Sequence, residues 1–498
     1  MLPPEYLQQV PDTMVKLYAQ VEEDILADMA RRISGFDMLI PSAKYQLQVL
    51  EEMGSLRSDI IAKLGTLTDK SKKELIRIMQ AAGVKALETD EAIYKAAGLS
   101  PSPLSASTAV QEVLDAGLKK TGGIFANLTK TTADTASQQF ERALDQAYMQ
   151  ISSGAISPGA AVQSAIKALA KDGVGAVTYP TGHIDNLEVA VRRATITGVN
   201  QTCLQMQWAR ADELGSDLVE VTAHAGARPS HAAWQGKVYS RSGKSKKYPA
   251  FVPATGYGTG AGLGGWNCSH SFYPYFEGAP RAYTEEQLKK YTAKDYEYNG
   301  QKMTEYEALQ TQRSIERNLR RWKREHMAME AAGVDTSEAA GKLAKWQRTQ
   351  RDFLDQTGLK RQSEREMVAG WDRHWAGQAT AAYLQDKPVI DTLEANGVKY
   401  VQRISPTEII VNAGKPKISK MTSHAEKNLA EKPDRAEMTQ EKAQAFVDGA
   451  KLTLYQENRG TLKFLSQDGY ALLSLEHRLV TAVPQKWRKR YDKYLKEE

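Results

Sequence analysis

The sequence HAGARPSHAAWQGKVYS (224–240), followed by GGWNCSHSFYPYFEG (264–278), decides how the centre of this chain folds. Four donors of the kind that zinc prefers occur there in two pairs: His224 with His231, and Cys268 with His270. Imidazole and thiolate are favoured zinc ligands, and four of them suit a closed tetrahedral site. The sequence therefore predicts a structural zinc ion held by these four side chains.

Two other interpretations of this segment stay open. The histidines could hydrogen-bond the turns of a small glycine-rich module without any metal. Alternatively, His231 could act as a base toward Cys268 as a nucleophile, although no third group that would orient the base can be placed.

The residues around the donors indicate short strands and loops. DLVEVTAHAG (217–226) is rich in β-branched residues and predicts a short β segment. TGYGTGAGLGGWN (255–267) contains six glycines and predicts a loop or close-packed turn. We expect residues 206–283 to form a small α+β module.

Residues 1–205 show the periodicity of helices. One apolar stripe recurs at three- and four-residue steps, namely Met14, Leu17, Val21, Ile25, Met29 and Ile33. A second helix is predicted after Asp69, with Gly83 as its stop. The stretches 98–107 and 152–161 are rich in Pro, Gly and Ser and predict loops. Long polar helices with thin stripes usually dock on a partner, and a plain helical bundle is the alternative.

The remaining chain predicts a helical connector over 284–377 and a separate α+β domain over 378–498. RSIERNLRRWKREHMAMEAAG (313–333) and GKLAKWQRTQRDFLDQTG (341–358) are strongly charged helical segments. Short apolar runs then predict a small antiparallel sheet preceded by one or two helices, with strands at 398–404, 407–413, 460–466, 470–476 and 478–484. The fold class is therefore multi-domain: mainly α in the N-terminal and connector regions, α+β in the centre and at the C-terminus.

Composition excludes several classes of protein. No run of about 18 apolar residues occurs, which argues against a membrane span. The first residues lack the pattern of a secretory signal, and two cysteines, Cys203 and Cys268, favour a reducing cytoplasm. Residues 414–498 contain 17 basic and 12 acidic side chains, so most of the net charge of +6 lies there. The basic end, QKWRKRYDKYLKEE (485–498), could equally be a solvated helix end.

The central block and the run YPTGHIDNLEVAVRRATITGVNQT (179–202) resemble the phage minor capsid protein 2 family, which is related to Mu-type head morphogenesis proteins. The resemblance extends over roughly residues 1–370 and rests on Arg228-Pro229, His231, Trp234-Gln235-Gly236, Gly265-Trp266-Asn267-Cys268 and His270. Ser269 departs from it, because an arginine is expected there. The resemblance implies a minor structural protein of the phage head, near the portal vertex, with portal and head proteins as partners. It also implies a place in the virion, and in the host cytoplasm during assembly.

The C-terminal region resembles, over about 120 residues, the barnase–EndoU–colicin–RelE-like nucleases attached to phage proteins. The resemblance rests on Ser423-His424, Arg435 and Thr481-Ala482. Metal-free RNA cleavage needs a base for the 2′-OH, an acid for the leaving 5′-oxygen and cations for the phosphate. We expect His424 as the base, Arg435 and Lys420 at the phosphate, a hydroxyl contact from Thr481 and His477 as a second acid or base.

Two functions follow as hypotheses. The first is a head protein that carries a C-terminal nuclease-like domain. The alternative is primarily an RNA-cleaving effector that travels with the virion. A degenerate domain that only binds RNA is also compatible with the C-terminal sequence.

Overall fold

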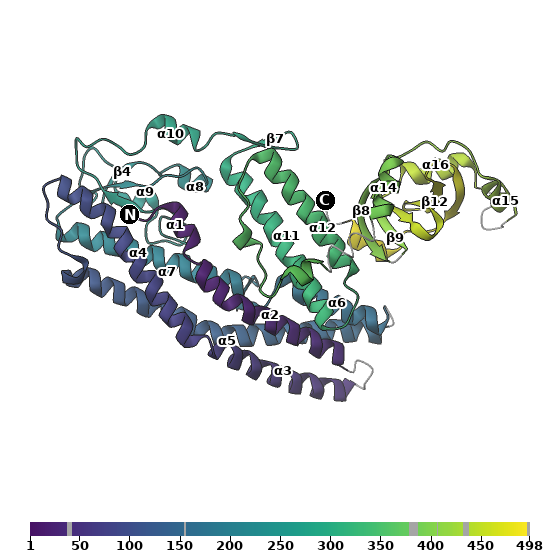
Figure 1. The fold of residues 1–498 in the computed structure, drawn as a ribbon, viewed down its shortest axis with the longest axis horizontal. Helices are drawn as coiled ribbons and strands as arrows, with labels where there is room; N and C mark the ends of the chain where they lie inside the picture. Colours follow the sequence, from purple (N-terminus) through teal and green to yellow (C-terminus); the bar gives the residue numbers. More distant parts are fainter. Residues whose placement is uncertain (37–41, 154–155, 378–386, 406, 432–437, 496–498) are drawn as a thin grey trace. The chain divides into compact units, whose positions relative to one another are not determined.

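The computed structural model describes residues 1–36, 42–153, 156–377, 387–405, 407–431 and 438–495. They form two compact units: Met1–Val334 with Gln350–Gly370, and Asp335–Thr349 with Trp371–Glu498. Long helices and a small central sheet make up the first unit, and a six-stranded antiparallel sheet with helices makes up most of the second (Figure 1). The multi-domain α and α+β fold class is confirmed.

The first half of the chain is helical, as its periodicity predicts. The helices are α1 (Pro4–Gln9), α2 (Asp12–Gly35), α3 (Ser42–Gly65), α4 (Thr68–Ala96), α5 (Thr108–Ser152), α6 (Pro158–Asp172) and α7 (Leu187–Glu213). Figure 1 shows α7 among the long helices, and it contacts α2, α4 and α5. The predicted stripe on α2 is buried at Met14, Ile25, Met29 and Ile33, while Leu17 and Val21 are half-buried.

The predicted helix boundaries at Asp69 and Gly83 are wrong. Helix α4 starts at Thr68 and runs through Gly83 to Ala96, so Asp69 lies inside its first turn. Gly83 is buried against α7, where an added Cβ would stand 2.8 Å from Cε of Met206. The glycine therefore allows close packing of two helices and does not end one.

A reciprocal Gly–Thr contact sets the distance between α5 and α7. A Cβ on Gly117 of α5 would lie 2.2 Å from Oγ1 of Thr202 on α7. A Cβ on Gly198 of α7 would lie 2.5 Å from Oγ1 of Thr121 on α5. Each threonine thus fills the space that the opposite glycine leaves.

The centre of the chain is a small three-stranded antiparallel sheet. Its order is β4 (Val238–Ser240), β3 (Leu218–Val221), β5 (Phe272–Pro274). The predicted β segment in 217–226 is confirmed as β3, and the glycine-rich stretch 255–267 is a loop that follows α9 (Phe251–Thr255). The other short elements of the unit are β1 (Gly175–Thr178), β2 (Ile184–Asn186), α8 (Pro229–Ala232), α10 (Glu285–Lys290), β6 (Tyr296–Tyr298) and β7 (Gln301–Met303).

Buried charge joins the connector helix α11 (Glu305–Ala331) to α2 and α7. Arg324 lies 3.2 Å from Glu23, 3.3 Å from Glu188 and 3.6 Å from Glu22, and Arg320 lies 3.0 Å from Glu188. Three acidic side chains thus surround two guanidinium groups in the interior. The charged sequence predicts a helix here correctly, but the structure buries part of its charge between helices. Helix α12 (Ser337–Thr357) follows after Gly333.

The second unit contains a meander of six strands in the order β13-β12-β11-β10-β9-β8. The strands and helices are α14 (Lys387–Ala395), β8 (Lys399–Ser405), β9 (Glu408–Asn412), α15 (Ser423–Glu431), α16 (Gln440–Asp448), β10 (Leu452–Gln456), β11 (Thr461–Leu465), β12 (Gly469–Ser474) and β13 (Leu479–Pro484). Five of these strands match the prediction, and β10 was missed. One face of the sheet packs on residues of α14, α15 and α16, and the other packs on Trp487, Tyr491 and Tyr494 of the C-terminal segment.

Candidate metal centre

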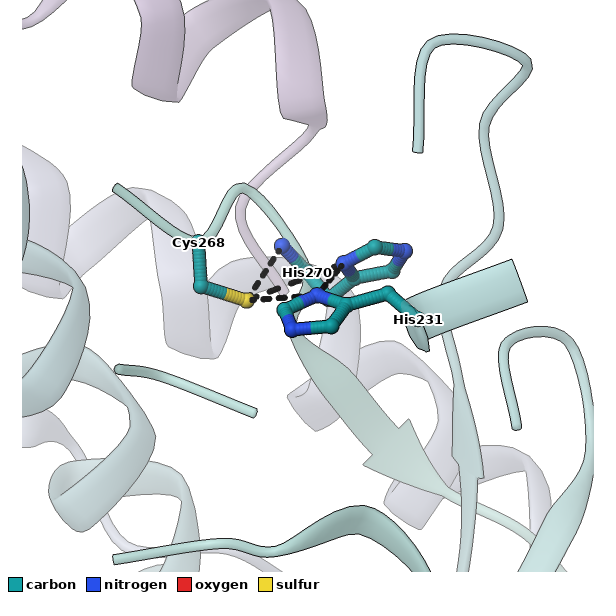
Figure 2. A group of neighbouring side chains, drawn as sticks. All are labelled: His231, Cys268 and His270. Atoms are coloured by element: carbon teal, nitrogen blue, oxygen red, sulfur yellow. Dashed lines mark hydrogen bonds between the residues drawn. The ribbon is translucent and has the colours of Figure 1, made fainter. Parts of the chain in front are cut away.

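Three of the four predicted donors converge on one point. The Sγ of Cys268 lies 3.6 Å from Nδ1 of His270 and 3.8 Å from Nδ1 of His231, and the two Nδ1 atoms lie 3.4 Å apart. Figure 2 shows the thiol facing both rings. All three side chains are buried. The structure therefore contains a His–Cys–His group that could hold a metal ion.

His224 does not join this group. Its ring packs 4.5 Å from the ring of His270, centroid to centroid, but neither of its nitrogens approaches the other three donor atoms closely enough to share an ion with them. Its Nε2 is buried without a hydrogen-bond partner among the described residues. The four-donor site of the sequence analysis thus becomes a three-donor group with His224 beside it.

The outer hydrogen bonds fix which ring nitrogen faces the shared point. Nε2 of His231 lies 2.8 Å from the carbonyl oxygen of Ala261, which can only accept, so this nitrogen carries the proton. Nε2 of His270 donates in the same way to Oε1 of Gln235, an oxygen that also accepts from the backbone N–H of His224. Each Nδ1 atom therefore carries a lone pair and no proton. Acceptors that hold the outer N–H of a ring in this way orient histidines that ligate metals.

The distances match the ligand spacing of tetrahedral zinc. Bonds of about 2.0 Å to nitrogen and about 2.3 Å to sulfur place neighbouring ligand atoms about 3.3–3.6 Å apart. In the structure two separations, 3.4 and 3.6 Å, lie in this range, and the one between Sγ of Cys268 and Nδ1 of His231, 3.8 Å, is slightly longer. Without an ion, two buried lone pairs would face each other with only one thiol proton to share. The donor set therefore fits a zinc ion by both its spacing and its chemistry.

Burial also favours the ligating forms of the imidazoles. It lowers the pKa of His231, and it lowers the pKa of His270 well below the ordinary value, with His224 as a secondary cause. Burial raises the pKa of the Cys268 thiol, while the backbone N–H of His270, 3.4 Å from Sγ, acts in the opposite direction. A thiol with a raised pKa is a poor nucleophile, which speaks against the catalytic interpretation of His231 and Cys268.

Helix α7 and the β3–β4 connection hold the donors in place. Nδ2 of Asn200 donates to the carbonyl oxygens of Cys268 and His270, at 2.9 and 3.2 Å. The ring of Trp234 packs against the rings of His231 and His270 at 4.5 and 4.8 Å. Sequence reasoning assigned no role to Asn200 or Gln235. Their only signal was their presence in the runs that carry the family resemblance.

The profile of the phage minor capsid protein 2 family matches residues 2–355, which include the whole metal centre. The chain belongs to this family. A structural protein of Lactococcus phage LL-H is 25% identical over 337 residues, which is 64% of this chain and 87% of that protein. A structural protein of Lactococcus phage mv4 is 36% identical over 126 residues, 25% of this chain and 94% of that protein. No solved structure matches the chain.

The family match ends at residue 355, before the sheet of the second unit begins. The predicted nuclease residues therefore lie in a part of this minor capsid family member that the match does not cover. In the described part of the chain, no helix has the length and apolarity needed to cross a membrane.

The structure places four of the five predicted nuclease residues. His424 lies exposed in the first turn of α15, and exposed Lys420 precedes that helix. His477 lies in the β12–β13 turn at φ +62°. Segment 419–422 runs beside residues 477–479, with Ser419 N–H donating to the His477 carbonyl at 3.0 Å.

Thr481 faces away from the helix that contains His424. Thr481 is buried opposite Leu472, whereas its neighbour Ala482 faces the helices of this unit. Successive strand residues point to opposite faces, so the Thr481 side chain lies away from α15. Arg435 lies outside the described residues.

Proposed function

We propose that this protein is a minor structural component of the phage head, that it resides in the virion and that it binds portal or other head proteins through its helical unit. Family membership supports the head role. The observation that carries the docking role is an apolar surface on α3, where Leu47 and Leu50 are 60% and 64% exposed. Exposed leucines one turn apart on a helix that also packs against α5 are typical of a protein-binding face.

Co-purification with heads tests this role. Tagged full-length protein is produced during phage infection, and proheads and mature particles are isolated. We expect the protein in both, and a Leu47→Ser/Leu50→Ser variant in neither. A Gln46→Ser variant, at an exposed polar position of the same helix, should be incorporated normally. Absence of the wild-type protein from both particles would contradict the proposal.

We further propose that His231, Cys268 and His270 hold one structural zinc ion. The ion would join the loop that contains Cys268 to α8, which contains His231, across the small central sheet. Its function there is to fix a glycine-rich module that has a small apolar core of its own. Elemental analysis of purified protein should find about one zinc per chain.

A second candidate function, metal-independent RNA cleavage, concerns the C-terminal unit. The observation that favours it is the backbone pairing of 419–422 with 477–479. Lys420 and His477 thus lie on adjacent segments, and the first of these leads directly into the helix that contains His424. In such a reaction His424 would take the 2′-OH proton, the 2′-oxygen would bond to phosphorus, and His477 would protonate the departing 5′-oxygen. Lys420 would pair with the phosphate.

This activity is tested on the full chain with single-stranded RNA in the presence of EDTA. We expect cleavage by the wild type, loss of cleavage in His424→Ala and unchanged cleavage in His374→Ala, an exposed histidine outside the sheet. Raised salt should weaken RNA binding if Lys420 contacts phosphate. RNA that stays intact with wild-type protein, or equal cleavage by the His424→Ala variant, would reduce this unit to a binding role.

A further inference from the structure

A cavity of about 780 Å³ opens directly beside the His–Cys–His group, and the three donors form part of its wall. Its volume lies in the range of small-molecule sites, roughly 300–1,000 Å³. Tetrahedral zinc with three protein ligands keeps one position for water or an outside ligand. His224 does not complete the set, so we infer that a fourth ligand would come from the cavity that the three donors line.

The cavity wall carries positive charge without acidic side chains. Arg193, Arg228 and Arg313 line it, and no aspartate or glutamate does among the described residues. Arg193 is neutralised by Asp185, whose carboxylate lies 2.6 Å from its guanidinium group. Among the described residues, the Arg228 side chain donates to the backbone carbonyl of Trp266 at 2.7 Å, and Arg313 makes no ion pair, although the charge of Glu316 acts on it. Two guanidinium groups are therefore left for an anionic ligand.

Aromatic surface lies at the same cavity. One side of the Trp266 indole packs over Gly260, where an added Cβ would stand 2.8 Å from the ring, yet the side chain is 64% exposed. Tyr179 and Tyr306 also line the cavity. An exposed indole beside arginines suits a ligand with a flat ring system and an anionic group, because flat rings stack on aromatic faces.

We propose that this cavity binds a small phosphate monoester, with one phosphate oxygen at the open zinc position and the others paired to Arg228 and Arg313. The proposal rests on the zinc site proposed above. Guanidinium groups match the geometry of phosphate oxygens, and zinc binds oxygen ligands at its open position. A nucleoside monophosphate would in addition stack its base on Trp266.

Calorimetric titration of full-length, zinc-loaded protein with inorganic phosphate and with AMP tests this site. We expect binding of one AMP per chain, tighter than that of phosphate. Arg228→Gln and Arg313→Gln should each weaken AMP binding about tenfold or more, with zinc content unchanged. Arg317→Gln, one turn along α11 from Arg313 and exposed to solvent, is the matched control and should bind AMP as the wild type does.

The outcomes separate this proposal from the zinc proposal. Protein that contains zinc but binds neither probe overturns the phosphate site and leaves the zinc site standing. Equal AMP binding by zinc-free Cys268→Ser protein overturns the role of the metal as a ligand of phosphate. Failure of the wild type to take up zinc at all overturns both. Tighter binding of a short DNA duplex than of AMP would assign the arginines to the nucleic acid backbone and overturn the small-molecule ligand.

Discussion

At the scale of single residues, the position of His224 decides whether the candidate metal centre has three donors or four. His224 contacts the ring of His270 but lies outside the group that could hold an ion. We expect His270→Ala and Cys268→Ser each to lose zinc, because two remaining donors hold the ion weakly. His224→Ala should retain about one zinc per chain. Elemental analysis of the three purified variants checks this, and loss of zinc from His224→Ala would restore the four-donor site.

The buried carboxylate Glu23 makes stability depend on pH. Burial raises its pKa to about 8, with Arg324 acting against that rise. The folded state thus keeps a proton that the unfolded chain releases near pH 4.5. The stability that this bound proton gives the folded state is fully present below pH 4.5 and is lost as the pH rises to about 8.

Glu23→Gln tests this dependence, because the amide resembles the protonated acid but cannot ionise. The melting temperature of the variant, relative to the wild type, should rise between pH 5 and pH 8.5, as measured by calorimetry. Buried acids that are not coupled to Glu23, such as Glu316, shift both proteins alike, so the difference reports Glu23 together with its coupling to Glu22 and Glu188. Parallel pH profiles for the two proteins would refute the assignment.

At the scale of helices, the α5–α7 contact reverses the usual effect of glycine. Alanine is favoured over glycine inside a helix by about 1 kcal/mol, so Gly123→Ala, with nothing near the added Cβ, should stabilise the protein. Gly117→Ala on the same helix forces a methyl group into Thr202. We expect it to destabilise the protein by about 1–3 kcal/mol, the usual cost of overpacking.

Chemical denaturation of both glycine variants measures these opposite effects. If Gly117→Ala were as stable as Gly123→Ala, the close approach of the two helices would not be a constraint on folding. The pair shares a helix and a substitution, so differences in helix propensity cancel and only the contact with α7 remains.

At the scale of the whole molecule, two compact units with separate cores predict two unfolding transitions. A chelator should lower the temperature of one transition, that of the unit with the His–Cys–His group. Phe464→Ala, in the core of the sheet, should lower only the other, by about 3–5 kcal/mol of that unit's stability. Differential scanning calorimetry with and without EDTA distinguishes these effects, and a single transition that both changes shift together would contradict two independent units.

The amino-acid sequence alone determined the features that depend on local order. The apolar period of α2, the glycine-rich loop 255–267, five of the six C-terminal strands and the donor types at His231, Cys268 and His270 are all readable from neighbouring residues. So was the family, because its motifs are contiguous runs. Strand β10 (Leu452–Gln456) was missed although it carries a strand signal, because its Leu-Thr-Leu-Tyr run alternates along the chain and follows the turn residue Gly449.

Tertiary structure decided everything that depends on which distant residues meet. Gly83 resembles a helix stop until Met206 of another helix packs on it. The charged helix α11 resembles a solvent-exposed one until Glu22, Glu23 and Glu188 surround its arginines. His224 resembles a ligand until the fold turns it beside His270 and leaves three donors at an arginine-lined cavity. The residue types in the sequence determine the chemistry of each side chain, but only long-range packing sets the distances on which ion binding and burial depend.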